Sequence, residues 1–316
     1  MWFDGELYYS VQMDRFSFDE SRYINSYIDY EEFILSGRRF QKTWIDPGNK
    51  LGIYQNTRRG GNLRLTDGNP HPVKIELKDL HGNTAVLEFT LLSRFKKVER
   101  EAPVFTQYMP YDEHNHFVSG DFTIDIVEES LYEDLKFNYR KINNNGRFFS
   151  DIHIVHDDKV PLHKNAVLSI KTADLPARYQ NKALVVMVDT ITGKVTSAGG
   201  SYIDGSVSSS IRNFGNFAVM VDTIPPVIVP LSFKADGELN ESSRIRFRIT
   251  DSLSGIKEYR GTLNGKWALF DYDAKTNTLV HYFDPKRFEL GKRHNFVLEV
   301  TDHKDNIKVY ETSFWK

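Results

Sequence analysis

Two pairs of residues have the spacing of zinc ligands. His114 and His116 form a His-x-His pair, and His153 is followed four residues later by Asp157. Histidine and carboxylate side chains bind zinc, and residues i and i+2 of a strand lie on one face. A metal or hydrolytic site would still need these groups to converge from distant loops, which nothing in the sequence predicts. We therefore interpret them as surface or turn residues and expect no metal-binding or catalytic residues in this chain.

Turns rich in Asp and Asn are candidates for calcium, because carboxylate and amide oxygens suit hard cations. The candidate ligands are Asp79, Gly82 and Asn83, then Asp302, Asp305 and Asn306, with Asp251 in a further turn. No complete Asp-x-Asp-x-Asp-Gly loop is present, and Asp, Asn and Gly form turns without any ion. We interpret these residues as turn formers and keep calcium as the alternative.

Other kinds of chemistry have less support in the sequence. The chain has no Cys and no Gly-x-Ser-x-Gly elbow, and the serines of Ser206–Ser210 have no positioned base. No Gly-x-Gly-x-x-Gly or Walker-type loop is present, so we expect no nucleotide cofactor. Trp2, Trp44, Trp267 and Trp315 could stack on sugar rings, although core packing is the expectation in a β-protein so rich in aromatic residues.

The composition excludes several classes of protein. A length of 316 residues suits two or three domains of roughly 100 residues each. The 41 basic and 43 acidic residues leave a net charge of −2, which argues against a nucleic-acid or acidic-membrane binder. The absence of Cys fits a cytosolic protein, or an exported one with large cores. The first residues lack the pattern of a signal peptide, and no apolar run is long enough to span a membrane.

An internal repeat indicates how the chain is organised. The stretch from His71 to Asn83 recurs as His294 to Asn306, 223 residues later. The matching positions are Val73 with Phe296, Ile75 with Leu298, Leu77 with Val300, Asp79 with Asp302 and Asn83 with Asn306. Each copy is an alternating apolar strand that leads into an Asp/Asn turn and a second strand. The repeat predicts two similar β-modules near the two ends of the chain.

We expect an all-β chain of three β-sandwich modules in tandem. The first, at 1–98, and the last, at 224–316, are expected to be Ig-like, with a middle β-sandwich module at 99–223. The charged segment 93–103 is the expected first linker. Pro225-Pro226 marks the second joint, since two prolines cannot donate to a sheet and hold the chain extended.

The last module carries the clearest strand pattern. About seven short strands follow residue 227, and Ile245, Phe247 and Ile249 alternate with Arg as in a half-buried antiparallel strand. Seven such strands in about 90 residues are typical of an Ig-like sandwich.

One helix, at about 20–36, is expected within the first module. Asp19 is the expected N-cap and Gly37 the expected C-terminal stop. The expected apolar stripe, which would face the core, is Ile24, Tyr27, Ile28 and Ile34.

A set of motifs, in this order, is similar to that of a known family. The motifs are Tyr9–Asp19, Arg22–Ser26, Asp29–Tyr30, Gly37–Lys42, Ser130–Asp134, Pro161–Lys164, Asp222–Pro226, Asp251–Ile256 and Gly265–Trp267. They resemble the non-catalytic C-terminal region of bacterial lysostaphin-type zinc metallopeptidases, the enzymes that cut peptidoglycan cross-links. The resemblance extends over essentially the whole chain and concerns the accessory region rather than the peptidase domain.

The resemblance places the family's zinc site elsewhere. That site uses a His-x-x-x-Asp pair followed, many residues later, by His-x-His. Here the order is reversed, with His114 and His116 before His153 and Asp157, so no catalytic role is carried over to these residues. The resemblance implies a zinc-binding peptidase domain upstream of residue 1, and no cofactor in this chain. The chain begins almost inside an expected strand, which agrees with such an arrangement.

These observations together give an expected function. We expect a non-catalytic accessory region of a cell-envelope zinc metallopeptidase, periplasmic or exported, with any signal peptide upstream. Its partners would be the upstream peptidase domain, peptidoglycan or another protein, and not nucleic acid. The alternative is a free-standing surface protein that binds glycan or protein through loops of the middle module.

Overall fold

A computed structural model describes residues 1–15, 17–94, 102–144, 146–233, 244–284 and 291–315. Strands account for 50% of the residues and helices for 9%, and the strands form several separate sheets, which confirms the expected all-β, multi-module fold. Within these ranges, no helix has the length and apolar character needed to cross a bilayer. The expected linker at 93–103 falls mostly outside the described residues.

The chain divides into two compact units. The first contains Met1–Lys141, His153–Leu168 and Ser210–Gly215, and the second contains Ile142–Ile152, Ser169–Ser209 and Asn216–Lys316. The three modules expected at 1–98, 99–223 and 224–316 are a different division of the sequence, and that division stays a prediction. Strands with residues in both units are β11 (Tyr139–Ile142), β12 (Ile152–Val155), β13 (Pro161–Lys171), β17 (Ser206–Asn213) and β18 (Gly215–Val221).

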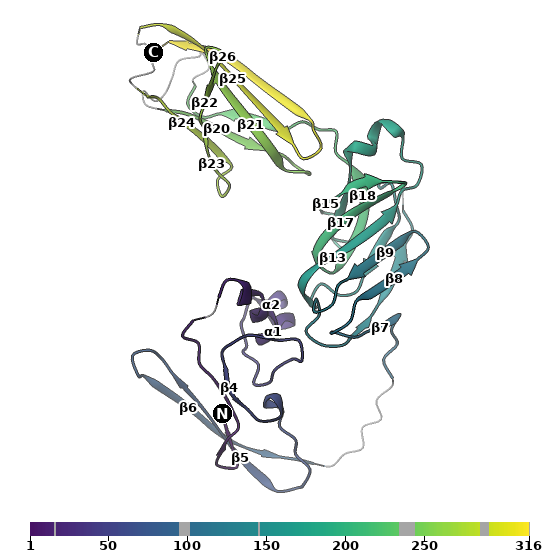
Figure 1. The fold of residues 1–316 in the computed structure, drawn as a ribbon, viewed down its shortest axis with the longest axis vertical. Helices are drawn as coiled ribbons and strands as arrows, with labels where there is room; N and C mark the ends of the chain where they lie inside the picture. Colours follow the sequence, from purple (N-terminus) through teal and green to yellow (C-terminus); the bar gives the residue numbers. More distant parts are fainter. Residues whose placement is uncertain (16, 95–101, 145, 234–243, 285–290, 316) are drawn as a thin grey trace. The chain divides into compact units, whose positions relative to one another are not determined.

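The first unit is built largely from short antiparallel strands (Figure 1). They are β1 (Trp2–Phe3), β2 (Glu6–Leu7), β3 (Tyr9–Val11), β4 (Tyr54–Thr57), β5 (Pro70–Lys78), β6 (Thr84–Leu92), β7 (Gln107–Met109), β8 (Asn115–Ser119), β9 (Phe122–Ile126) and β10 (Leu135–Phe137). Strands β2, β1, β5 and β6 form one sheet in that order, while β3 pairs with β4, β7 with β10 and β8 with β9. Asp4 and Gly5, with φ of 52° and 77°, form the tight turn between β1 and β2.

The helix expected at 20–36 is present as three consecutive segments. They are the 3₁₀ turn η1 (Asp19–Tyr23), the helix α1 (Ile24–Tyr27) and the helix α2 (Tyr30–Ser36). Ile28 has extended backbone angles (φ −94°, ψ 161°), which ends α1. The expected apolar stripe is partly wrong, because Tyr27 and Ile28 are buried whereas Ile34 is 44% exposed. Phe33 of α2 packs against the cluster that contains Tyr27 and Ile28 instead.

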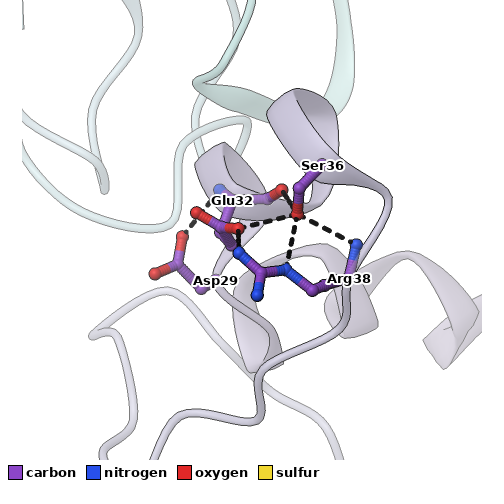
Figure 2. Close-up of polar contacts among 4 residues, drawn as sticks. All are labelled: Asp29, Glu32, Ser36 and Arg38. Atoms are coloured by element: carbon purple, nitrogen blue, oxygen red, sulfur yellow. Dashed lines mark hydrogen bonds and ion pairs between the residues drawn. The ribbon is translucent and has the colours of Figure 1, made fainter.

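Side-chain hydrogen bonds fix the two ends of α2 (Figure 2). Asp19, the expected cap, makes no capping bond, and Asp29 caps α2 instead by accepting from the Glu32 N–H at 3.0 Å. Ser36 Oγ donates to Glu32 Oε1 at 2.7 Å, and Arg38 Nη2 lies 2.7 Å from the same oxygen. Gly37 ends α2 in the left-handed conformation (φ 73°), as the sequence predicts.

The second unit contains further strands and, at its C-terminal end, two facing sheets. The strands are β14 (Ala183–Val188), β15 (Val195–Gly199), β16 (Ser201–Ile203), β19 (Val227–Pro230), β20 (Arg244–Thr250), β21 (Ile256–Leu263), β22 (Lys266–Ala268), β23 (Asp271–Asp273), β24 (Thr278–Tyr282), β25 (Arg293–Asp302) and β26 (Ile307–Trp315). Strand β14 pairs with β15 and β18, and β16 pairs with β17. Two further short 3₁₀ segments, one in each unit, are η2 (Arg58–Gly61) and η3 (Ala177–Lys182).

The described residues from 227 to 315 form a β-sandwich. One sheet has the order β19-β20-β24-β23 and the other the order β22-β21-β25-β26. The alternating Ile245, Phe247 and Ile249 are all 0% exposed and pack against Phe296 and Leu298 of the facing sheet, as their pattern predicts. The neighbouring short strands β22 and β23 belong to different sheets, so the chain crosses between the sheets at residues 269–270.

The internal repeat is a structural repeat. Hairpins β5–β6 and β25–β26 have the same register, since Lys78 pairs with Thr84 and Thr301 pairs with Ile307 at the repeat offset. The preceding hairpins also correspond: β1–β2 lies beside β5 as β21–β22 lies beside β25. Asn264 and Gly265 have φ of 50° and 76°, which matches the turn at Asp4 and Gly5. The sequence repeat therefore predicts the local structure correctly.

Candidate functional site

The expected zinc-ligand residues lie in two different settings. His114 and His116 are exposed and share one carboxylate, with Asp125 Oδ1 at 3.4 Å from His114 Nε2 and 2.7 Å from His116 Nδ1. The residues alternate on and beside β8, so their side chains reach the neighbouring strand β9. The three side chains form one exposed contact between β8 and β9.

His153 is a core residue. It is 0% exposed, its Nδ1 lies 2.8 Å from the Tyr139 hydroxyl, and its ring stacks on Phe122 with centroids 5.1 Å apart. Asp157 lies in the turn after β12, where its Oδ1 accepts from the Lys159 N–H at 3.0 Å. Over the described ranges, only Asp222, Asp251 and Asp302 bring three potential ligand atoms within 4.8 Å of one another. The four histidine and aspartate candidates therefore do not gather into such a group.

A cluster that we name the tyrosine junction joins the helical segment of the first unit to β13. It consists of Arg22, Tyr23, Tyr132 and His163. The Tyr132 hydroxyl donates to the Arg22 carbonyl at 2.6 Å and lies 3.1 Å from His163 Nδ1. Arg22 Nη1 donates to the His163 carbonyl at 2.5 Å, and the Tyr23 ring stacks on the His163 ring with centroids 4.1 Å apart. Side chains and backbone carbonyls from three distant parts of the sequence thus contact one another.

Burial and charge favour the neutral forms of two members of the tyrosine junction, His163 and Tyr132. Burial lowers the pKa of His163, and the positive charge of Arg22 lowers it further. Burial also raises the pKa of the Tyr132 hydroxyl. The Tyr132 hydroxyl donates its one proton to the Arg22 carbonyl, so its oxygen can accept from a neutral His163 protonated at Nδ1, because neutral imidazole has one N–H donor. His163 and Tyr132 are therefore both neutral at neutral pH, which suits a structural hydrogen bond between them.

Contacts around the tyrosine junction join the same elements. The Gly48 N–H donates to the Tyr132 carbonyl at 2.7 Å, and a Cβ at Gly48 would lie 2.6 Å from the Leu131 carbonyl oxygen. Only glycine permits this close approach of two backbones. Lys50 pairs with Glu129 beside it.

A second cluster, the aspartate junction, consists of Asp222, Asp251 and Asp302. Asp222 follows β18, Asp251 follows β20 and Asp302 ends β25. Asp222 and Asp302 are 2% and 0% exposed. Three segments of the second unit therefore place carboxylates together at one buried point.

Backbone amides satisfy these carboxylates. Asp222 accepts from the Ser254 N–H at 3.0 Å, and Asp251 accepts from the Gly255 N–H at 2.7 Å. Asp302 accepts from the Lys304 N–H at 2.7 Å and from the Asn306 side-chain amide at 2.8 Å. Hydrogen bonding of this kind stabilises buried carboxylates without an ion. We interpret the cluster as a structural joint.

Lys304 and Asn306 complete the aspartate junction. Asn306 Nδ2 also donates to the Asp222 carbonyl at 3.0 Å, and the buried Lys304 ammonium donates to the Gly200 carbonyl at 2.7 Å. Burial lowers the pKa of Lys304, and the surrounding carboxylates, Asp222 first, oppose that shift. The turn after β25 is thereby tied to residues 200 and 222 of the same unit.

Five of the nine family-like motifs of the sequence supply residues of these two junctions. Arg22–Ser26, Ser130–Asp134 and Pro161–Lys164 each supply residues of the tyrosine junction. Asp222–Pro226 and Asp251–Ile256 supply carboxylates of the aspartate junction. The sequence pattern offered no signal for this convergence beyond the motifs themselves, because turn residues and isolated tyrosines carry no information about their distant partners.

Three of the four tryptophans are exposed, although core packing was expected for them. Core packing is wrong for Trp44, Trp267 and Trp315, which are 41%, 65% and 68% exposed. Trp2 is half-buried, with the Lys74 ammonium 5.3 Å from its ring. Trp267 also lines a cavity at one edge of the C-terminal sandwich.

We name this cavity the edge cleft. Its volume is about 580 Å³, and the described residues that line it lie between Leu263 and His294 in the sequence. Exposed side chains that line it include Lys266, Trp267, Leu269, Asp271, Tyr282 and Arg293. It lies beside β22, the edge strand of its sheet, and beside the end of β24, where β23 stops opposite Val280. The cleft therefore combines exposed aromatic rings, charges of both signs and two sheet edges.

Comparison with protein families finds one match. Residues 106–222 match the model of a Zu5-like domain, which starts just before β7 and ends at Asp222. The match lies within the segment expected as the middle module and carries no clear indication of function. A comparison with curated proteins finds no significant match to the chain.

Proposed function

We propose that this chain is the non-catalytic accessory region of a cell-envelope zinc metallopeptidase. Its role is to hold an upstream peptidase domain in position against peptidoglycan, or to dock on peptidoglycan or a protein partner. The observation that supports the proposal is the structural role of the residues in the family-like motifs. Their residues form the tyrosine junction and the aspartate junction, which join distant segments, rather than a constellation of nucleophile, base and metal ligands.

The physical case for a positioning role rests on what the junctions do. Each one ties together segments far apart in the sequence through buried or half-buried hydrogen bonds, such as Tyr132 to Arg22 and Asn306 to Asp222. Because partly satisfied buried groups cost free energy, such networks favour a single arrangement of the segments they join. A chain with fixed internal joints can act as a spacer of defined geometry.

The non-catalytic character can be tested on the isolated chain. We expect equilibrium dialysis to show no stoichiometric zinc, and we expect no release of muropeptides from cross-linked peptidoglycan by the zinc-supplemented chain. Tight zinc binding together with hydrolysis would show that the chain is itself a peptidase.

The positioning role can be tested on the chain joined behind a lysostaphin-type peptidase domain. Tyr132→Phe removes the hydroxyl that contacts Arg22 and His163 and should lower cleavage of intact sacculi, with cleavage of a short soluble peptide unchanged. Tyr202→Phe, which removes a hydroxyl that accepts from Gln180 outside the junctions, is the matched control. Equal sacculus cleavage by both variants would contradict a positioning role for the tyrosine junction.

A further inference from the structure

We propose that the edge cleft of the C-terminal sandwich binds an acidic oligosaccharide, with Trp267 and Tyr282 as stacking platforms. The inference rests on the proposed function only for the source of that sugar, the glycan strands of peptidoglycan. The cleft itself is argued from the residues that line it.

Exposed aromatic rings are the first reason. Trp267 is 65% exposed and Tyr282 is 58% exposed, and both line one cavity. By contrast, Phe247, Phe296 and Phe314 of the same sandwich are at most 1% exposed. Large rings presented to water in a concave site are a costly arrangement that a ligand with apolar faces relieves. The C–H faces of pyranose rings have that character.

The polar side chains of the cleft suit hydroxyl groups. Asp271 supplies a carboxylate acceptor at the start of β23, and Lys266 supplies an ammonium donor at the start of β22. The two sheet edges add main-chain groups, since β23 stops before His281 and Tyr282 while β22 pairs only with β21. Sugar hydroxyls are both donors and acceptors, so they can use both kinds of group.

The balance of charge points to an acidic sugar. Among the described residues, three basic side chains (Lys266, Lys292 and Arg293) and two acidic ones (Asp271 and Asp284) line the cleft. Among the basic ones, the Arg293 guanidinium is held by a hydrogen bond from its Nε to Ser313 Oγ at 2.8 Å. A guanidinium fixed in this way can present its planar fork to a carboxylate. A carboxylate-bearing sugar such as N-acetylmuramic acid meets this requirement.

The floor of the cleft is held in place before any ligand binds. His281 Nδ1 donates to the Leu269 carbonyl at 2.8 Å, which ties β24 to the segment that crosses from one sheet to the other. Phe270 beside it is buried against the His281 ring, with centroids 5.3 Å apart. A site on a rigid scaffold loses less entropy on binding than a mobile loop does.

The test uses the whole chain and two soluble probes. One is a peptide-free tetrasaccharide of alternating N-acetylglucosamine and N-acetylmuramic acid, and the other is the neutral N-acetylglucosamine tetrasaccharide. Isothermal titration calorimetry should show tighter binding of the acidic probe. Trp267→Ala should weaken that binding by about tenfold or more. Arg293→Gln should remove the preference for the acidic probe, and Trp44→Ala, an exposed tryptophan of the other unit, should leave binding unchanged.

The outcomes separate the cleft from the proposed function. Failure to bind either probe, or undiminished binding by Trp267→Ala and Tyr282→Ala, overturns the cleft inference. Retention of the wild-type chain and of Trp267→Ala on insoluble sacculi to the same extent also overturns it, while docking on peptidoglycan still stands. Hydrolysis of peptidoglycan by the isolated chain would overturn the proposed function and leave the binding result at the cleft to stand by itself.

Discussion

Hairpins β5–β6 and β25–β26 are two copies of one local structure in two different settings. Asp79 accepts from the N–H groups of His81 and Asn83 at 2.9 and 2.8 Å and from the Asn83 side chain at 2.7 Å. Asp302 makes the same three bonds with Lys304 and Asn306, at 2.7, 2.9 and 2.8 Å. The four-residue separation of Asp and Asn therefore specifies the turn in both copies.

The settings of the two turns differ. Asp79 and Asn83 are exposed, whereas Asp302 and Asn306 are buried, and Asn306 donates onward to Asp222. The faces of the hairpins differ as well. Val300 is 0% exposed in the sandwich core, and Leu77, at the equivalent position, is 62% exposed. The same sequence pattern thus forms a surface turn after β5 and part of the buried aspartate junction after β25.

The comparison shows that turn chemistry and turn energetics have different origins. The side-chain oxygens of Asp satisfy nearby backbone N–H groups wherever the turn lies, because the interaction is local. The free energy gained depends on the surroundings, since a buried donor left without a partner has no water to replace it. Substitutions at equivalent positions should therefore have unequal effects.

The largest difference should come from the turn aspartates. Asp302→Ala leaves two buried N–H groups and the Asn306 amide without their acceptor, so we expect a loss of about 3 kcal/mol in unfolding free energy. Asp79→Ala should cost much less, because water replaces the exposed carboxylate. Amide hydrogen exchange of β25 and of β5 measures both losses. Equal losses of unfolding free energy in the two variants would show that burial of the second turn does not strengthen its contribution to stability.

The next difference concerns the hairpin faces. Val300→Ala removes buried methyl groups from the sandwich core and should lower the unfolding free energy of that module by about 2 kcal/mol. Leu77→Ala should change stability by no more than about 0.5 kcal/mol, as is usual for exposed positions. Denaturant titration with region-resolved hydrogen exchange provides the measurement. A large loss for Leu77→Ala would mean that its face is covered in solution.

A smaller difference should appear at the left-handed turn position. Gly82 has φ of 85°, and Asp305 occupies the equivalent position with φ of 56°. Gly82→Ala forces a Cβ into that conformation and should cost about 1 kcal/mol. Asp305→Gly should relieve the backbone but remove the Lys257 ion pair, so its net effect on the melting temperature should be close to zero. A marked fall in melting temperature for Asp305→Gly would show that the Lys257 ion pair contributes more to stability than relief of the left-handed backbone conformation does.

The smallest difference should be in pH dependence. His71 lies between Asp4 Oδ2 at 2.8 Å and Asp67 Oδ1 at 2.9 Å, and these bonds raise its pKa above the ordinary 6.5. The equivalent His294 is buried, and its Nδ1 lies 2.9 Å from Asn264 Nδ2, an amide donor. A raised folded pKa means that the stabilisation is complete below pH 6.5 and is lost as pH rises through the folded pKa.

The stability of the first unit should therefore fall as the pH rises above 6.5 and through the folded pKa of His71. We expect the stability of β5, measured by hydrogen exchange corrected for pH, to fall through that window in the wild-type chain. His71→Gln should abolish this fall, and Asp4→Asn should reduce it. A wild-type profile that is flat across the window would show that both ion pairs are screened by solvent.

Several features follow from the sequence with little help. The repeat at 223 residues predicts two hairpins of the same register, and the alternation of Ile245, Phe247 and Ile249 predicts a buried strand. Gly37 marks the end of a helix correctly. Such features depend on neighbours in the chain, and local patterns encode them directly.

Other features depend on contacts that no local pattern contains. The helix expected at 20–36 breaks at Ile28, which packs with Leu51 and Ile53, residues more than twenty positions away. Trp267 carries the same apolar signal as a core residue, yet it lies exposed at the edge cleft. Asp222, which the sequence marks only as the start of a proline joint, is an acceptor at the aspartate junction.

The sequence by itself determined the all-β class, the two matching hairpins and the Asp–Asn turns, because these features arise from side-chain alternation and short-range hydrogen bonds. Only the tertiary structure decided which of the two turns is buried and that Asp222, Asp251 and Asp302 meet. It also decided that Arg22, Tyr132 and His163 form one cluster. The physical reason is that burial and long-range pairing depend on how distant segments pack, and identical local motifs acquire different energies from different surroundings.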